Sequence, residues 1–386
     1  MKIYTMTWYT GNNYGSVLQA YALPYAIKRL GYPCEILAYH PPFVQKLHNM
    51  LINRNLAAHI QYKLNAFKMR KQTSDNRAVD SNLALFDAFR QRHMHITPVV
   101  HTAKDIRALT GKDAVFVCGS DQIWNPHFYD PYYFLHFVKN PVRKIPYAPS
   151  FGVKEMPSYQ RGRIGKCLRS FNAFSVREPR GGDFIKELTG REAFVACDPT
   201  ALLTKEEWTE LATPVKTPEN PYVFCYFLSY NAHYMETARR AAESLGMELK
   251  VLPMRSEDMD LEETIKEPVG PTEWLTWLSN ASLVLTDSFH CALFSIRFGK
   301  DFYIFQRFAA NNKRGQNSRI ENLLSRTGLE DRMIAWETSP EAFLTIAPER
   351  RAYAADALTQ HAETSLAWLQ AQLALAEGDA AREGET

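Results

Sequence analysis

Strand-like and helix-like stretches alternate along almost the whole chain, and this alternation limits the folds that the chain can adopt. Residues 1–8 alternate as a strand does, and residues 16–31 carry apolar side chains at helical spacing before a glycine stop signal. Apolar strand-like runs, amphipathic helices and polar turns recur through residues 222–306. A regular alternation of this kind predicts parallel sheets that are doubly wound by helices.

The alternating elements form two series, which predicts two domains. The first series occupies residues 1–205 and the second occupies residues 221–345, while residues 346–386 read as a C-terminal helix and a polar tail. A chain of 386 residues is long for one core and fits two domains of ordinary size. We therefore predict an α/β protein in which two Rossmann-like domains face each other across a cleft.

The composition excludes several classes of protein. Hydrophobic residues make up 46% and charged residues 23%, which is a globular balance. The formal net charge of +3 is small, so we expect no nucleic-acid partner. The six cysteines contain no CxxC pair, which favours reduced core thiols in a cytoplasmic protein over disulfides or a zinc site. We also expect no signal peptide and no membrane-spanning segment, because neither pattern occurs.

Residues 41–77 differ from the rest of the chain in their charge. This segment contains seven basic residues and a single acid, Asp75, with apolar side chains interleaved at roughly helical spacing. One interpretation is a solvated helical excursion on the N-terminal domain. The other is a basic amphipathic surface that contacts anionic lipid or a lipid-linked substrate at the inner face of a membrane. The sequence leaves both interpretations open.

Polar side chains gather where the apolar strand of residues 282–287 gives way to a helix. Asp287 and Ser288 follow the strand, and His290 lies at the start of the helix. Backbone N–H groups at a helix N-terminus favour an anion. A histidine there can bind a phosphate or carboxylate, or exchange a proton near neutral pH. We favour this interpretation over a structural histidine that is satisfied by a backbone carbonyl.

Charged residues follow two further strand-like runs. Arg177 comes before a Pro-Arg-Gly-Gly turn, and its planar guanidinium group suits a carboxylate or phosphate. An ion pair with Glu178, or the start of a capped helix, would also explain Arg177. Asp198 follows the next run and precedes a proline, so a turn-forming role is the better explanation for it.

Two loops of the N-terminal half have the composition of binding loops. The stretch "TGNNYGS" joins a strand to a helix through Gly11 and Gly15, and glycine allows the backbone to approach a ligand closely. It lacks the GxGxxG pattern and the acidic residue that holds a ribose, which weakens a dinucleotide-binding interpretation. The stretch "CGSDQIWNP" combines carboxylate, amide and indole groups that suit a sugar, namely Asp121, Gln122, Trp124 and Asn125. A turn packed by Trp124 is the alternative.

A polar loop after the last clear strand carries Lys313, Arg314 and Arg319. It either closes over the cleft and covers an anion or is a plain surface loop. The chain contains no His/Cys cluster with metal-ligand spacing, no GxSxG stretch and no Walker loop, so we expect no metal.

In combination, these stretches resemble the polysaccharide pyruvyl transferase family. The resemblance extends in family order over about three quarters of the chain. Cys291 follows the histidine where the family pattern has glycine. The matching stretches are "NNYGSVLQAYAL" (12–23), "GSDQIWNP" (119–126), "SFG" (150–152), "VREPRG" (176–181), "CDPTALL" (197–203), "EWLTWLSNASLVLTDSFHCALFSI" (273–296) and "SRIENLL" (318–324).

The resemblance implies a GT-B-like fold and the transfer of the pyruvyl group of phosphoenolpyruvate to two hydroxyls of a sugar. The product is a cyclic ketal in a surface polysaccharide (an exopolysaccharide or capsule) or in its lipid-linked precursor, with release of phosphate. The family's arginine and histidine correspond to Arg177 and His290, and its lysine to Lys313. The N-terminal domain would then be the acceptor side and the C-terminal domain the phosphoenolpyruvate side. No cofactor is implied beyond the donor substrate.

The chemistry of phosphoenolpyruvate assigns provisional roles to these residues. Binding a phosphate and a carboxylate on one small molecule requires several cations and oriented N–H donors. An acid must protonate the methylene carbon, for which His290 is the candidate with Asp287 as its partner, and Asp121 is the candidate base. The expected donor-binding residues are Arg177, Ser288, His290, Lys313, Arg314 and Arg319. The expected acceptor-binding residues are Asn13, Tyr14, Gly15, Asp121, Gln122, Trp124 and Asn125.

Two other functions are compatible with the same architecture. A nucleotide-sugar glycosyltransferase would share the cleft and the anion site, but it needs a base pocket and a ribose-binding acid that the sequence does not display. A non-catalytic glycan-binding subunit would keep Trp124 but would not need Arg177 and His290 together.

Overall fold

The computed structural model describes residues 1–54, 77–111, 113–229, 231–307, 317–335, 338–340 and 342–384. The N-terminal half of the chain is built on a parallel four-stranded sheet of order β2-β1-β3-β4. Its strands are Ile3–Met6 (β1), Cys34–Ile36 (β2), Val115–Cys118 (β3) and Lys144–Pro146 (β4). The accompanying helices are Tyr14–Arg29 (α1), Phe43–Ile52 (α2), Arg77–His93 (α4) and Ala103–Thr110 (α5).

The C-terminal half contains a parallel five-stranded sheet of order β11-β10-β9-β7-β8. The strands are Tyr222–Tyr226 (β7), Glu248–Val251 (β8), Leu283–Thr286 (β9), Asp301–Phe305 (β10) and Met333–Ile334 (β11). The helices are Ala232–Leu245 (α9), Pro271–Asn280 (α10), Phe289–Phe298 (α11) and Asn317–Thr327 (α12). The predicted α/β architecture with parallel sheets is therefore confirmed.

Shorter elements complete the fold between and around the two sheets. Ser175–Val176 (β5) and Phe194–Val195 (β6) form a two-stranded parallel sheet. The neighbouring helices are Ser158–Leu168 (α6), Pro179–Thr189 (α7) and Lys205–Leu211 (α8). Single helical turns occur at Pro126–Phe128 (η1), Pro131–Phe134 (η2), Pro141–Arg143 (η3), Pro199–Ala201 (η4), Ser256–Asp260 (η5) and Glu330–Arg332 (η6).

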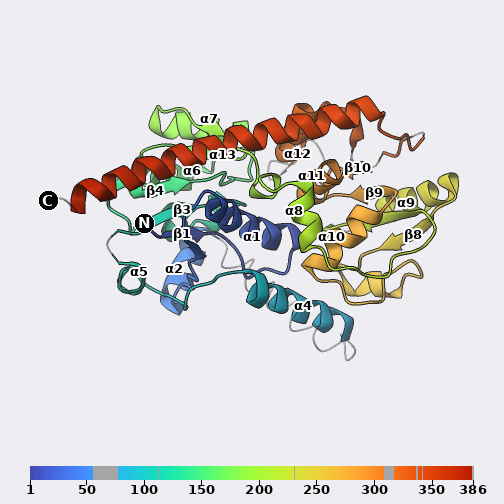
Figure 1. The fold of residues 1–386 in the computed structure, drawn as a ribbon, viewed down its shortest axis with the longest axis horizontal. Helices are drawn as coiled ribbons and strands as arrows, with labels where there is room; N and C mark the ends of the chain where they lie inside the picture. The colour runs from blue at the N-terminus through green and yellow to red at the C-terminus, as the bar shows by residue number, and fades with distance from the viewer. Residues whose placement is uncertain are drawn as a thin grey trace.

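The last helix, Pro348–Gly384 (α13), connects the two halves (Figure 1). It packs on α11 and α12 of the C-terminal half and on η3 and η4 of the N-terminal half. The Ser365 hydroxyl accepts a hydrogen bond from the backbone N–H of Cys197 at 2.9 Å, and Asn140 donates to Asp379 at 2.8 Å. The sequence predicted a helix followed by a polar tail, but the chain stays helical to Gly384. Apolar residues continue along one face of the helix as far as Ala376 and are buried there.

One hydrophobic cluster runs through both halves of the molecule. It includes residues of β1 and α1 together with residues of α10, α11 and α13. Tyr14 lies where the two halves meet: its ring stacks on Trp274 with the centroids 5.6 Å apart, and its hydroxyl donates to the Val269 carbonyl at 2.8 Å. This shared core holds the loops of the two halves in a fixed relation.

The six cysteines are free, and five of them are buried, as the sequence predicted for core thiols. In the part of the chain that the structure describes, no helix combines the length and the apolar character needed to cross a membrane. Of the basic segment 41–77, residues 55–76 lie outside the described residues, whereas α2 and α4 border this stretch on either side.

Candidate active site

The predicted polar turns converge at the carboxyl ends of the parallel strands. Asp121 follows β3, Arg177 follows β5, Asp198 follows β6, and His290 begins α11 after β9. Four short strands therefore bring residues from positions 121 to 290 into one cluster. In open α/β sheets this edge is where ligands bind.

Arg177 lies at the centre of the cluster and is only 3% exposed. Its Nη1 is 2.6 Å from Oδ2 of Asp198, and its Nη2 is 3.6 Å from Oδ1 of Asp121. Burial alone would lower the pKa of Arg177, but these carboxylates outweigh burial and raise it. Glu178, the partner considered from the sequence, instead accepts hydrogen bonds from the Ser150 hydroxyl at 2.8 Å and from a backbone N–H.

His290 contacts both halves of the chain. Its Nε2 lies 3.4 Å from Oδ2 of Asp198. Its ring packs against Gly15, where a Cβ atom would stand only 2.2 Å from Nδ1. The sequence interpretation of Gly15 as a place for close ligand approach is therefore corrected: the side chain that comes close is His290. Any larger residue at position 15 would displace the imidazole.

Asp198 is the carboxylate that the two cations share. Burial would raise its pKa, but the positive charges of His290 and Arg177 hold the pKa of this carboxyl well below its usual value. Its Oδ1 accepts hydrogen bonds from the backbone N–H and the hydroxyl of Thr200 at 3.0 and 2.8 Å. The turn-forming role inferred from the Asp-Pro sequence is present, and the ion pairs are additional to it.

Arg319 of α12 adds a third cation. Its Cζ atom lies 5.9 Å from the centroid of the Phe289 ring, and the Cζ of Arg177 lies 5.2 Å from the same centroid. Burial, followed by the charge of Arg177, lowers the pKa of Arg319 to about 10, so its guanidinium group is still charged at neutral pH. The other two cations expected from this segment, Lys313 and Arg314, lie outside the described residues.

Several donor atoms of the cluster have no hydrogen-bond partner among the described residues. They are Nε and Nη2 of Arg177 and Nε2 of His290, all three buried. Buried polar groups are almost always paired in folded proteins, and an unpaired donor is costly. Nitrogen atoms on an arginine and an adjacent histidine are well placed to bind the oxygen atoms of one anion.

Asp121 occupies the N-terminal side of the cluster in a left-handed backbone conformation with φ of 61°. Its Oδ2 accepts a hydrogen bond from Ser16 at 2.7 Å, and its Oδ1 accepts one from the Gln122 N–H at 2.9 Å. Burial raises its pKa, but Arg177 and His290 outweigh burial and lower it. A carboxylate held ionised by cations in this way is a weak base, which counts against the role expected for Asp121.

Asp287 serves a different loop from the one that the sequence suggested. Its two oxygens accept hydrogen bonds from the backbone N–H groups of Leu228 at 2.6 Å and Ser229 at 2.9 Å, and Arg307 Nε lies 3.4 Å away. Burial raises the pKa of Asp287. Asp287 thus holds the loop after β7. The position beside His290, where the sequence predicted Asp287, is occupied by Asp198. Ser288 caps α11 by accepting a hydrogen bond from the Cys291 N–H at 3.4 Å.

Two aromatic residues expected to bind the acceptor are part of the core instead. Trp124 is fully buried, stacks on Phe134 at 5.1 Å and donates its indole N–H to the Tyr133 carbonyl at 3.1 Å. Tyr14 is buried where the two halves meet. Neither ring has a free face for a sugar, so these two expectations are wrong. Apolar packing at the end of β3 explains Trp124 better than ligand binding does.

The amide side chains expected to bind the acceptor shape the loops. Asn13 caps α1 by accepting from the Ser16 N–H at 3.1 Å. Asn125 donates to Oε1 of Gln122 at 3.0 Å and accepts from the His127 N–H at 2.9 Å. Gln122 also lies beside Gly152, where a Cβ atom would be 2.1 Å from its Oε1. These contacts position the loop that carries Asp121.

Comparison with known proteins identifies the family. A model of the polysaccharide pyruvyl transferase family matches residues 13–307, which is most of the chain. The chain belongs to the polysaccharide pyruvyl transferase family. Family membership makes it a transferase, with a polysaccharide as the kind of acceptor that the family name specifies. The match spans every loop of the cluster except that of Arg319. No curated protein matches the chain.

Comparison with solved structures shows which fold this chain shares with other proteins. The structure described as OtsA in its apo form has a TM-score of 0.52 at 9% identity, covering 96% of this chain and 98% of that chain. UDP-GlcNAc 2-epimerase from Neisseria meningitidis, bound to UDP-GlcNAc, has a TM-score of 0.45 at 7% identity, covering 97% and 94%. At such low identity the OtsA similarity shows the GT-B-like fold and nothing about the reaction.

Sequence reasoning on the family motifs missed the partner of His290. Asp198 lies in a matching motif, "CDPTALL", but its proline neighbour already explained the aspartate as a turn former. Ser16 and Arg307, which contact Asp121 and Asp287, also gave no recognisable signal. The position of Asp198 at the end of a strand, like that of Arg177, was the available clue.

Proposed function

We propose that this transferase moves the pyruvyl group of phosphoenolpyruvate onto two hydroxyls of a sugar in a surface polysaccharide or its lipid-linked precursor. The observation that carries the proposal is the set of buried nitrogen atoms on Arg177 and His290 that have no hydrogen-bond partner among the described residues, with Arg319 beside them. Phosphoenolpyruvate presents two anionic groups on a small frame, and binding it requires several converging cations. The family match supports the same donor chemistry.

The reaction balances without an added oxidant or cofactor. A proton adds to the methylene carbon, which becomes the methyl group, and the adjacent carbon becomes electrophilic. The first sugar hydroxyl forms a C–O bond to that carbon and loses its proton. The C–O bond to phosphate then breaks, the second hydroxyl attacks, and its proton leaves with the phosphate as the ketal closes.

We assign the proton transfer to the methylene carbon to His290. Histidine is the side chain that most often transfers protons in enzymes, and His290 is the histidine of this cluster. Asp198 would fix the positions of the His290 imidazole and the Arg177 guanidinium group relative to the bound phosphoenolpyruvate. Asp121 would balance part of the positive charge of Arg177. Arg177 and Arg319 would neutralise the phosphate as it leaves. Asp121 and Asp198 are poorly suited to act as base for the sugar hydroxyls, because both carboxyls have lowered pKa values.

We also propose that α2 brings the enzyme to a membrane surface that carries lipid-linked acceptor. Phe43 and Val44 are 78% and 77% exposed, and Leu47 and Leu51 extend the same apolar face. The sequence around this helix is strongly basic. An exposed apolar helix face with basic surroundings suits anionic lipid, since apolar insertion and electrostatic attraction act together.

The proposed reaction is tested by incubating the full chain with phosphoenolpyruvate and a panel of galactose- and mannose-type acceptors, lipid-linked where possible. The expected result is phosphate release together with an acceptor whose mass has increased by one pyruvate ketal. Phosphate release without ketal would indicate simple hydrolysis. Transfer of a sugar from a UDP-, GDP- or CMP-sugar would establish a glycosyltransferase in place of the proposed activity.

A further inference from the structure

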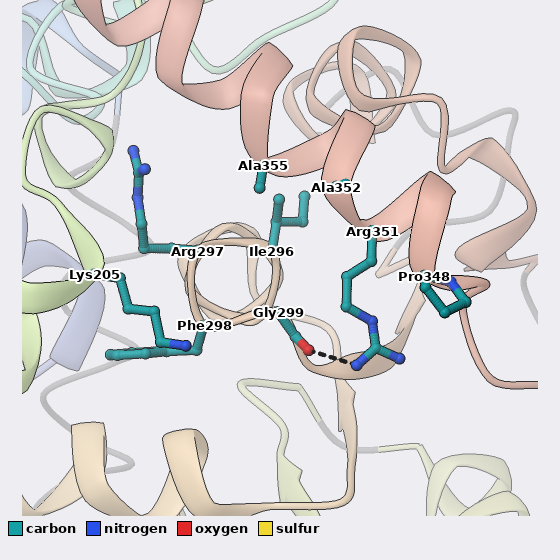
Figure 2. A pocket seen from close by; sticks show the side chains of 9 residues that line it. All are labelled: Lys205, Ile296, Arg297, Phe298, Gly299, Pro348, Arg351, Ala352 and Ala355. Atoms are coloured by element: carbon teal, nitrogen blue, oxygen red, sulfur yellow. Dashed lines mark hydrogen bonds between the residues drawn. The ribbon is translucent and has the colours of Figure 1, made fainter.

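A second pocket lies at the opposite end of α11 from His290. It has a volume of about 430 Å³ and opens between the last turn of α11, the start of α13 and the start of α8. Figure 2 shows its lining side chains around the end of α11. One part of the lining is apolar and the other is basic. The apolar residues are Ile296, Phe298, Pro348, Ala352 and Ala355, and the basic residues are Lys205, Arg297 and Arg351.

The basic residues approach the pocket from different elements. Figure 2 shows Lys205 on one side of the end of α11 and Arg351 on the other, with the Arg351 guanidinium group bonded to the Gly299 carbonyl. The Arg297 guanidinium group extends away from them and donates to the Ala201 carbonyl at 2.6 Å. Lys300 lies nearby: burial, followed by the charges of Lys205 and Arg351, lowers its pKa. Four cations therefore share this end of α11.

The acids that face this group neutralise it only in part. Asp301 pairs with Arg351 at 2.9 Å. The charges of Glu206 and Glu207 raise the pKa of Arg297 and so oppose the effect of burial, but Glu207 is already paired with Arg29 at 2.8 Å. Among the described residues, the buried Nε atoms of Arg297 and Arg351 have no hydrogen-bond partner. The pocket thus keeps an excess of positive charge, and Arg351 Nε is a donor without a hydrogen-bond partner in the described part of the chain.

We propose that this pocket binds a small organic phosphate, with its phosphate between Lys205 and Arg351 and its apolar or aromatic body against Phe298 and Pro348. The volume is within the range of pockets for molecules of nucleotide size. Lysine and arginine together suit a phosphate, because one supplies a point charge and the other directed donors. The apolar wall distinguishes an organic phosphate from inorganic phosphate.

The position of the pocket links such a ligand to the active site. Helix α11 carries His290 at one end and Arg297 and Phe298 at the other. Arg297 also holds the carbonyl of Ala201 in η4, the turn that is capped by Asp198. A ligand that shifts α11 moves His290, and one that shifts η4 moves Asp198. Either shift changes the geometry of the Asp198–His290 ion pair. Binding at the pocket and binding of the donor are therefore expected to influence each other reciprocally.

The test uses the full chain with adenosine 5′-monophosphate and pyrophosphate as probes, titrated by calorimetry at matched ionic strength. We expect saturable binding of both, tighter for the nucleotide. The double change Lys205→Glu and Lys300→Glu should weaken binding by about tenfold or more, the scale of losing charge-assisted hydrogen bonds. Lys216→Glu, a single charge reversal at an exposed site outside the pocket, should leave the affinity unchanged, whereas Lys205→Glu alone should weaken it.

Two further variants separate this site from the active site. Ala352→Trp fills the pocket without removing a cation and should also abolish binding. Arg177→Gln alters the active site and should leave nucleotide binding intact. The proposal is overturned if neither probe binds saturably at millimolar concentration, if the lysine and tryptophan variants bind normally, or if Arg177→Gln abolishes binding. None of these outcomes depends on whether the enzyme transfers pyruvate.

Discussion

At the scale of single residues, Asp198 joins Arg177 of the N-terminal half of the chain to His290 of the C-terminal half. Its carboxylate is within 2.6 Å of Arg177 and 3.4 Å of His290, and all three side chains are buried. Removing one member of a buried ion pair leaves the other charge without compensation, which typically costs more than the pair contributes. The geometry of the site and the stability of the fold therefore depend on the same carboxylate.

The first prediction concerns Asp198→Asn. The variant should lose about 3–5 kcal/mol of unfolding free energy at neutral pH, because Arg177 loses its shortest ion pair while it remains buried. The folded-state pKa of Asp198 is depressed. Its ionised form therefore stabilises the fold above the unfolded-state pKa of about 3.9, and this contribution is lost as the pH falls towards the folded-state value.

Urea unfolding of the wild type and the variant from pH 7 downwards measures this difference. The gap in unfolding free energy between the two proteins should narrow below about pH 4. Asp356→Asn, at an exposed position of α13, is the control and should be close to neutral. An Asp198→Asn variant as stable as the wild type at pH 7 would show that the pair does not hold the site together.

The second prediction concerns His290→Gln, which keeps hydrogen bonding but cannot act as an acid near neutral pH. If His290 transfers the proton, phosphate release should fall by about 10²-fold or more. The melting temperature should stay within about 2 °C, because Asp198 keeps its ion pair with Arg177 and its hydrogen bond from Thr200, and a change of order 1 kcal/mol shifts the melting temperature by no more than that in a chain of this length. Normal turnover by a folded variant would remove His290 from the mechanism, and Arg177→Gln would then test the anion site alone.

At the scale of secondary-structure elements, α2 exposes four large apolar residues and buries none of its own, while the adjacent C-cap residue Asn53 is buried. The Asn53 side chain donates to the Tyr129 carbonyl at 3.0 Å, so the helix is anchored at its C-terminal end while its apolar face stays open. The charge reversals that the sequence would suggest, at Lys68, Arg70 and Lys71, lie outside the described residues. The apolar face itself offers the sharper test.

The third prediction concerns the double change Phe43→Ser and Val44→Ser. It should abolish binding to vesicles that contain anionic lipid, because both side chains are available for insertion. Stability and activity on a soluble acceptor should be unchanged, since these side chains contribute little to the core. Leu344→Ser, at another exposed apolar position, is the matched control. Vesicle sedimentation at increasing salt measures the effect, and wild-type protein that fails to bind at low salt would refute the membrane contact.

At the scale of the whole molecule, local patterns predicted the fold better than they predicted the site. The strands and helices carry strong periodic signals, and the carboxyl-end rule placed Arg177 and His290 in one cluster. The choice between Asp287 and Asp198 as partner of His290 depends on how the two halves pack, which no local pattern encodes. The same holds for Trp124, whose indole suits a sugar in composition but is covered by Phe134 in the fold. The continuous helix α13 likewise depends on contacts with both halves.

The shared core has a thermodynamic consequence for the whole molecule. Because residues of both halves and of α13 belong to one hydrophobic cluster, we expect them to unfold together in a single transition. A ligand that binds only the folded state then stabilises the entire chain. The melting temperature of that transition is therefore a direct measure of which donor the cluster around Arg177 recognises.

The last prediction is that phosphoenolpyruvate raises this melting temperature and that UDP-, GDP- and CMP-sugars do not. At about 100 times Kd the stabilisation is about 2.7 kcal/mol. This corresponds to roughly 3 °C for a chain of this length. Arg177→Gln should remove the shift, because it removes the guanidinium donors that face the anion. Lys205→Glu should leave the shift in place, since Lys205 belongs to the pocket at the other end of α11. Stabilisation by a nucleotide sugar alone, abolished by Arg177→Gln, would assign the cluster to a glycosyltransferase donor.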